Sequence, residues 1–578
     1  MIGVPSGARR FLASAIVLVV GIYYLWGVQA AGYGFRWRTD LGGYYNHLAR
    51  GFAEGHLYVP IRPSSELLAM PNPWSPSIDD RYRMQDMALF GGRYYLYFGA
   101  APAVVLFLPW RLVTSHDLPE NFALFLFCFG GYLFYCAAFL RLLQMAGAYP
   151  RPLVLGAMLL ALGVCQSVPF LLNRVWVYEI AIGGGYFFTA GGVYALTRGI
   201  AHQSNVRWLV IAGLMFGLAT ASRPDLMFAG GVATAGLWFY GPERKRWMLS
   251  FLAGFGAILA AIAVYNYQRF GNPFEFGFRY QLAGLGQNRV DVSLGHLLPG
   301  IFHFLLAPPE FSAVFPWVRI VLRHPFTLPA DYFVEPIVGA VWLAPFVIGI
   351  MFLPRRKVLR QVRVLLWIIT GSGVSIALFL MSTHLVTQRY EVDFLPLMVF
   401  AALTGFAAVD RPLRSTIPLV MAIIFGTVLN LAVAISGPYE EMLANRPQQY
   451  ARLARIFSPI PGFRLLFNPN VQLEFDLHPQ TDIAHQTLVT LGHGPHSYSL
   501  FAEGLRLISQ TDQSTLTLDL PSEPVHLRLI SSAGFIFIER EGRCLLRQPM
   551  RALVMAPSEI TVTAPAVRLI QVGARNAP

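Results

Sequence analysis

Charged residues and cysteines are scarce in this chain. Only 13% of its 578 residues are Asp, Glu, Lys or Arg, against about 25% in typical soluble domains. The four cysteines form no CxxC pair, and three of them, Cys128, Cys136 and Cys165, lie in apolar segments. The composition therefore indicates neither a soluble protein nor a disulfide framework or a cysteine zinc site.

Long apolar runs are abundant instead. Hydrophobic residues make up 55% of the chain, and runs near the ~20 residues needed to cross a ~30 Å hydrocarbon core recur along most of it. The net charge of +13 comes mostly from basic residues in short loops between these runs, where Lys and Arg mark the cytoplasmic side. We therefore interpret this charge as a sign of membrane topology and expect no nucleic-acid partner.

The N-terminal segment reads MIGVPSGARR followed by FLASAIVLVVGIYYLWGVQA. This apolar run is longer than the core of a signal peptide, and no small-residue cleavage site follows it cleanly. We predict an uncleaved first span with Arg9 and Arg10 on the cytoplasmic side. That orientation places Asp40 outside, in the stretch RWRTDLGGYYNHLARGFAEGHLY.

The strongest basic loops, at 242–247, 354–363 and 410–415, should all be cytoplasmic. The later spans are predicted near 248–266, 333–353, 364–382, 393–409 and 415–436. Earlier apolar segments lie near 96–113, 121–143, 152–172, 177–197, 208–221 and 226–241. Alternation needs an odd number of crossings among these six, so we expect a half-length or re-entrant segment around 222–225.

The predicted fold is thus a polytopic α-helical membrane protein of about 11–12 spans with a C-terminal soluble all-β sandwich. The membrane domain covers 1–436, with outer loops at 32–95 and 267–332. Residues 437–578 contain short alternating runs separated by turn residues, which predict strands on the outer face. These runs are VQLEFDL, STLTLDL, VHLRLIS, GFIFIER, EITVTAP and VRLIQVG.

The first outer loop supplies candidate acidic residues. Leu41, Tyr45, Leu48 and Phe52 recur at helical spacing, so 41–54 is predicted to be an amphipathic helix lying on the membrane. Asp40 stands at its start, either as a helix N-cap or as a catalytic carboxylate. Tyr44 is a candidate substrate contact beside it. Farther along the loop are three candidate ligands of a divalent cation, which could equally be solvated: Asp79, Asp80 and Asp86.

Charged residues also lie at or inside apolar segments, where a charge at a helix centre costs roughly 2.5–3.5 kcal/mol on insertion scales. They are Arg174, Glu179, Arg223 and Asp225 in one region, and Arg269, Arg279, Arg389, Glu391 and Asp393 in another. They either pair among themselves or snorkel to headgroups, or they form a cavity that recognises an anionic headgroup. The planar fork of arginine suits phosphate oxygens.

The layout resembles the C-type (GT-C) membrane glycosyltransferases, and the match covers roughly residues 8–436. It rests on a first span followed by a long outer loop with an early Asp, and on the stretches GLATASRP and YNYQRFGNPFEFG. The nearest branch is bacterial and uses polyprenyl-phosphate sugars. Two features of the class are absent. Asp40 has no paired acid beside it, and RYYLYFGAAP stands where several members have a His-Pro-Pro-Leu type motif.

The resemblance implies an enzyme of the bacterial inner membrane that moves a sugar from a polyprenyl-phosphate donor to an envelope glycan, lipid or protein. Its outcome would be inversion, with Asp40 as general base. Arg223 and Arg389 are predicted to contact the donor phosphate, with Arg174 and Arg279 in reserve. Glu179, Tyr390 and Tyr44 complete the predicted substrate site.

Two other classes of function stay open from the residues. A transporter or flippase of a lipid-linked sugar would use the same arginines, but no inverted repeat between the halves is visible. An acyl- or phosphotransferase acting on envelope glycans would use one of the outer histidines as a base, although the chain has no GxSxG and no metal-type histidine motif. These histidines are His47, His56, His296, His303 and His384.

Overall fold

We analysed a computed structural model of the whole chain. It describes all residues except 1–5, 31–35, 40, 76–81, 202–204, 241–242, 284–289, 312–314, 321, 323–324, 331, 353–358, 409–412, 439–441, 443–445, 458–470, 478–484, 492–496, 512–514, 533–534, 541–542, 550–559, 564–566 and 573–578. The chain divides into two compact units. The helical unit comprises Met1–Pro309 and Ile320–Asn445, and the β unit comprises Glu310–Arg319 and Arg446–Pro578.

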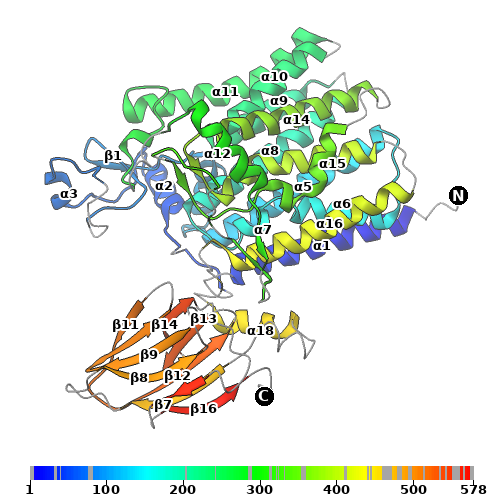
Figure 1. Cartoon of the computed structure of the whole chain (residues 1–578). Helices are drawn as coiled ribbons and strands as arrows, with labels where there is room; N and C mark the ends of the chain where they lie inside the picture. Colours follow the sequence, from blue (N-terminus) through cyan, green and yellow to red (C-terminus); the bar gives the residue numbers. More distant parts are fainter. Residues whose placement is uncertain are drawn as a thin grey trace. The chain divides into compact units, whose positions relative to one another are not determined.

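Within the described residues, the helical unit contains seven helices that are long and apolar enough to cross a membrane (Figure 1). Their bounds are α1 (Ser6–Ala30), α5 (Glu120–Met145), α8 (Val177–Ala201), α11 (Arg244–Phe270), α14 (Arg360–Met381), α15 (Glu391–Ala407) and α16 (Leu413–Ser436). Shorter helices are α2 (Tyr44–Ala53), α3 (Ser65–Ala69), α4 (Leu108–Thr114), α6 (Pro152–Val164), α7 (Val168–Leu171), α9 (Arg207–Thr220), α10 (Met227–Tyr240), α12 (Leu297–Ile301) and α13 (Ala340–Leu343). The chain therefore has the polytopic helical fold that its apolar runs predict.

The helices pack side by side in two series. In the first, α5 lies against α8, α8 against α9, and α9 against α11; in the second, α1 and α16 both lie against α6. Glycines allow a close approach between α9 and α11. A Cβ added at Gly213 would lie 2.0 Å from the Phe251 carbonyl oxygen, and one at Gly254 would lie 2.2 Å from that of Val210. Small residues at such crossings let helix backbones touch.

The two helices beside residues 222–225, where we expected a half-length or re-entrant segment, are short, and one predicted span does not form a long helix. Helices α9 and α10, on either side of residues 222–225, have 14 residues each, about 21 Å at 1.5 Å per residue. The span predicted at 333–353 is wrong, because its described residues form a two-residue strand at Phe333–Val334, the four-residue α13 and the 3₁₀ helix η6 (Pro345–Phe352), and no long helix. Pro336 and Pro345 interrupt it, and proline removes a helical hydrogen bond and clashes with the preceding turn.

The amphipathic helix predicted at 41–54 forms as α2, but its apolar face does not lie on a membrane. Tyr45 and Leu48 are completely buried within the protein, and the Tyr45 ring stacks on Phe107 at 5.5 Å. The N-cap residue is Gly43, at φ 70°, and no side chain caps the helix. The helix therefore belongs to the folded core of the helical unit.

Short strands order two loop regions of the helical unit. Strands β1 (Ala88–Phe90) and β2 (Arg93–Tyr95) form an antiparallel hairpin. Strands β5 (Phe333–Val334) and β6 (Leu385–Val386) pair in parallel. This second pairing joins the loop before α13 to the segment that leads into α15.

The β unit is an antiparallel sandwich of two five-stranded sheets, with the orders β11-β10-β9-β8-β15 and β14-β13-β12-β7-β16. The strands are β7 (Val471–Leu477), β8 (Gln486–Leu491), β9 (Tyr498–Glu503), β10 (Arg506–Gln510), β11 (Thr515–Asp519), β12 (Val525–Ser532), β13 (Phe535–Arg540), β14 (Arg543–Pro549), β15 (Ile560–Val562) and β16 (Val567–Val572). The same unit holds α18 (Pro447–Phe457) and the loop pair β3 (Glu310–Phe311) and β4 (Val318–Arg319).

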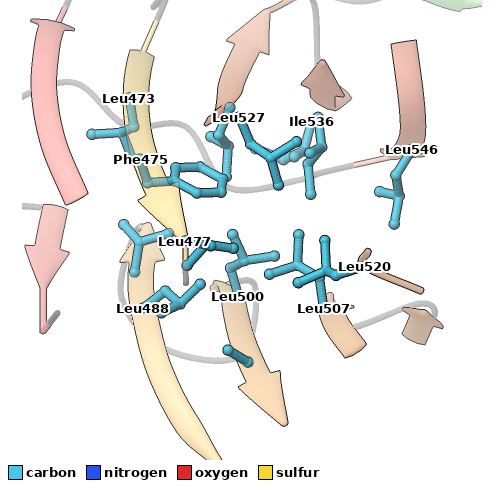
Figure 2. Packing of buried hydrophobic residues seen from close by; sticks show 14 of the residues in the cluster. Leu473, Phe475, Leu477, Leu488, Leu500, Leu507, Leu520, Leu527, Ile536 and Leu546 are labelled. Carbon is cyan, nitrogen blue, oxygen red and sulfur yellow. The ribbon is translucent and has the colours of Figure 1, made fainter. Parts of the chain in front are cut away.

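The sandwich core is built from alternate residues of both sheets (Figure 2). Leu473 and Phe475 of β7 and Leu527 of β12 face Leu488, Leu500 and Leu507 of the opposite sheet. Alternation with period two buries one face of each strand and leaves the other to water. All six runs singled out in the sequence are strands of this sandwich.

Candidate functional site

Arg223 lies at the break between the two short helices α9 and α10. Pro224 has no N–H and disfavours a helical conformation at the residue before it, and Arg223 is extended, with φ −141° and ψ 112°. Its side chain meets two carboxylates. Nη2 is 2.7 Å from Asp393 Oδ2, and Nε is 3.5 Å from Asp225 Oδ1. Tyr390 covers the guanidinium, with Cζ 4.7 Å from the ring centroid.

Arg389 lies in the 3₁₀ turn η7 (Gln388–Tyr390), directly before α15. It also meets two carboxylates. Nη1 is 3.4 Å from Glu335 Oε2 and 3.8 Å from Glu179 Oε1, and Nη2 donates to Glu335 Oε1 at 3.4 Å. Its Cζ lies 4.6 Å from the centroid of the Tyr178 ring. Both arginines predicted to contact phosphate are thus paired with carboxylates and stacked on tyrosines.

Tyr178 connects Arg389 to the loop between α1 and α4. Its hydroxyl donates to Asp86 Oδ2, and Gln281 Nε2 donates to Asp86 Oδ1 at 2.9 Å. Burial raises the pKa of the Asp86 carboxyl, although these two hydrogen bonds and the charge of Arg389 act in the opposite direction. Both carboxylate oxygens of Asp86 are therefore occupied by side chains of the protein, which favours an anchoring role over the predicted metal ligand.

The structure brings most of the predicted substrate residues to this cluster. Glu179 lies in the first turn of α8 and is 2% exposed, and it contacts Arg389. Tyr390 covers Arg223, and the Tyr44 hydroxyl donates to the Gln85 carbonyl beside Asp86 at 2.6 Å. Arg174 is half-buried, with Cζ 5.5 Å from the Trp176 ring centroid. No salt bridge to Arg174 occurs in the part of the chain that the structure describes.

Other predicted residues lie elsewhere or are not described. Arg279 is exposed in the 3₁₀ turn η3 (Phe278–Tyr280) and does not join the cluster. Arg269 is buried at the end of α11 and donates to the Leu96 carbonyl at 2.8 Å. Asp40, Asp79 and Asp80 lie outside the described residues. Within the described residues, no group of three or more His, Cys, Asp or Glu side chains is arranged to hold a metal ion.

Two carboxylates of interest were not singled out from the sequence. Glu335 contacts Arg389, as described above. Glu120, in the first turn of α5, is 1% exposed and accepts a hydrogen bond from the Gly43 backbone N–H at 3.0 Å. Gly43 is three residues after Asp40 in the chain. The one sequence signal for Glu120 was a carboxylate at the start of an apolar run, directly after Pro119.

Arg223 and Arg389 together with their ion-pair partners bring two cations and four carboxylates together from distant parts of the chain; the carboxylates are Asp225, Asp393, Glu179 and Glu335. Buried charges need partners, because removing an ion from water costs several kcal/mol even after relaxation. Arg223 and Arg389 both meet this requirement with carboxylates of the same chain. Pairing among the charged residues, one of the alternatives that the sequence left open, therefore occurs for both. A ligand that binds either guanidinium must therefore compete with a carboxylate or use an N–H that the carboxylates leave open.

Comparisons with known proteins give matches among solved structures alone. A scan against protein-family models and a search of curated protein sequences return no match. The oligosaccharyltransferase of Archaeoglobus fulgidus in the apo form matches with 14% identity and a TM-score of 0.41, over 74% of this chain and 56% of that one. Archaeal AglB of that organism, in complex with an inhibitory peptide and a dolichol-phosphate, matches with 12% identity and a TM-score of 0.41, over 79% and 59%.

ArnT from Cupriavidus metallidurans, bound to undecaprenyl phosphate, matches with 11% identity and a TM-score of 0.41, over 79% of this chain and 82% of that one. The chain spans less than two thirds of the archaeal enzymes. These structural neighbours are of the GT-C kind that the sequence resembles. The proposals that follow rest on this chain's own residues.

Proposed function

We propose that the protein is a membrane glycosyltransferase that moves a sugar from a polyprenyl-phosphate donor to an envelope glycan, lipid or protein. The observation that carries this proposal is the charged cluster around Arg389. Here a largely buried guanidinium lies over the Tyr178 ring, with Cζ 4.6 Å from its centroid, and the Tyr178 hydroxyl donates to Asp86 of the loop at 32–95. A planar fork of N–H donors in a site with little water suits a phosphate that leaves with its charge.

The proposed reaction needs two actions from the protein. The donor's phosphate must be held while negative charge develops on its bridging oxygen, and we assign this task to Arg389, with Arg174 nearby. The acceptor hydroxyl must lose its proton as it attacks the anomeric carbon, and we assign this to Asp40. A positioned base contributes typically 10²–10⁴-fold to such a step. One direct displacement without a covalent intermediate inverts the anomeric centre.

The prediction that Arg223 also contacts the phosphate stays a prediction, and the geometry favours Arg389. The 2.7 Å contact to Asp393 holds Arg223 more tightly than any carboxylate contact of Arg389. We assign Arg223 mainly to the framework that joins α15 to the α9–α10 break. The proposed orientation has the N-terminus in the cytoplasm of a bacterial cell and both the cluster and the β unit outside the inner membrane.

The test uses the full chain purified in detergent. Farnesyl phosphate serves as a short probe of the donor, and its dissociation constant is measured for the wild type, R389M and the surface control R246M, whose partner Glu243 is exposed. A charge-assisted hydrogen bond is worth roughly 1.5–3 kcal/mol, so R389M should weaken binding about 10- to 100-fold. Equal binding in all three proteins would place the phosphate site elsewhere.

A further inference from the structure

The two arginines of the cluster are paired in different ways. The Arg223–Asp393 contact is 2.7 Å, and the Asp393 side chain is 1% exposed. The contacts between Arg389 and Glu335 are both 3.4 Å, and the Glu335 side chain is 12% exposed. The first pair is short and its carboxylate side chain is almost completely buried, whereas the second is longer and the Glu335 side chain is partly exposed.

Glu335 also differs from the other carboxylates in its support. Asp393 and Glu179 lie in the first turns of α15 and α8. Glu335 instead follows the two-residue strand β5, and its backbone N–H donates to the Val386 carbonyl at 2.9 Å. Its main chain is thereby held near Arg389, and Glu335 lies in a loop and not in a helix.

The contacts of Glu335 use the edge of the guanidinium that suits a bidentate anion. Glu335 Oε2 faces Nη1, and Oε1 faces Nη2. A phosphate with two oxygens on these nitrogens would occupy the same positions, because paired N–H donors recognise carboxylate and phosphate alike. Glu179 contacts Nη1 through one oxygen at 3.8 Å, which leaves this edge to Glu335.

We propose that Glu335 and the donor phosphate compete for the Nη1–Nη2 edge of Arg389, so that Glu335 sets the affinity of the site for phosphate. This inference rests on the proposed function. Phosphate binding then exchanges one anion for another and sends the carboxylate to water. After transfer the phosphate is released more readily, because Glu335 pairs with the Arg389 guanidinium again.

The expected size follows from charge repulsion. Two unit charges about 5 Å apart near a protein surface repel strongly enough to change a binding constant more than tenfold. E335Q removes this charge and keeps the shape of the side chain. It should bind farnesyl phosphate at least about tenfold more tightly than the wild type. A side chain with a merely structural role would not give a gain of affinity when replaced.

The experiment measures dissociation constants for the full chain in detergent, with farnesyl phosphate, inorganic phosphate and farnesol as probes. The proteins are wild type, E335Q, R389M, the E335Q/R389M double variant and E243Q, which removes an exposed carboxylate from a surface pair. We expect E335Q to gain affinity for both phosphates and none for farnesol. The gain should vanish in the R389M background, because the two changes act on one contact.

The outcomes separate this inference from the proposed function. If R389M weakens farnesyl phosphate binding while E335Q leaves it unchanged or weakens it, competition by Glu335 is refuted and the phosphate site stands. If neither variant changes binding, the phosphate site itself is wrong. An equal gain for farnesol, or for E243Q, also overturns the competition. Should E335Q fail to fold, E335D keeps the charge on a shorter stem and should bind more tightly than the wild type, since it reaches Arg389 less well.

Discussion

Replacing Arg223 by Met tests the framework of the cluster. The change removes a guanidinium that two carboxylates contact, Asp393 at 2.7 Å and Asp225 at 3.5 Å. Their side chains are 1% and 9% exposed, so the charges left behind have little access to water. Removing one partner of a buried ion pair typically costs 3–5 kcal/mol, because the other charge stays uncompensated. We expect a loss of stability of about this size in R223M.

The assay is thermal unfolding of the purified protein in detergent, measured as the fraction of protein that has not aggregated at each temperature. R246M is the matched control, because its pair with Glu243 is 2.7 Å long but about half exposed, and exposed pairs contribute about 0–1 kcal/mol. Adding D393N to R223M should recover part of the loss, since it removes one of the stranded charges. If R223M unfolded at the same temperature as R246M, Arg223 would not hold this framework, and its predicted contact with the donor phosphate would be favoured instead.

Three further predictions concern the base, a titrating group and the β unit. D40N should keep the fold and lower turnover by at least about 10²; near-normal turnover would remove Asp40 from the mechanism. Burial raises the pKa of Asp86, so the folded state binds the proton of this carboxyl more tightly than the unfolded state does. The group therefore stabilises the fold at low pH, and this contribution is lost as the pH rises through the folded pKa. Melting temperatures should therefore favour the wild type over D86N increasingly as pH falls from 7 to about 4, and a difference that does not vary with pH would contradict this. F475A should destabilise the β unit of the full chain by about 3–5 kcal/mol, measured as a lower unfolding temperature in detergent. Protease should reach residues 440–578 in spheroplasts from the outer face, and cleavage after lysis alone would reverse the proposed topology.

The sequence predicted those parts of the fold that depend on local pattern. Apolar runs of spanning length became α5, α8, α11, α14 and α16, because a buried helix needs little besides length and apolar side chains. Alternation identified six strands of the sandwich for a similar reason. The segment at 333–353 has the composition of a span, yet its prolines and Gly339 decide against a helix. A Cβ at Gly339 would lie 2.4 Å from the Leu305 backbone, a tertiary constraint that composition does not contain.

The candidate site was predicted because charged side chains in apolar segments are energetically costly. Arg223, Glu179 and Arg389 stood out because charges in apolar segments are expensive, and the structure brings them into one cluster. Their partners were less visible. Glu335 lies in a polar loop, where a carboxylate is ordinary, and its contact with Arg389 depends on the two-residue pairing of β5 with β6. Asp86 was noticed as a candidate metal ligand, but a sequence does not show that Tyr178 and Gln281 donate hydrogen bonds to its carboxylate.

The placement of residues 310–319 affects how the protein can be dissected. This stretch belongs to the β unit although the chain on both sides of it belongs to the helical unit. In the β unit, the Phe315 ring lies 5.3 Å from Tyr450 of α18, whose hydroxyl donates to the Phe315 carbonyl. The two units are consequently joined by three covalent crossings, at 309–310, 319–320 and 445–446. A truncation before α18 would therefore not remove a complete domain, because it would leave the loop that contains Phe315 without its partner Tyr450. Loss of activity in such a truncation would report on this loop as much as on the sandwich.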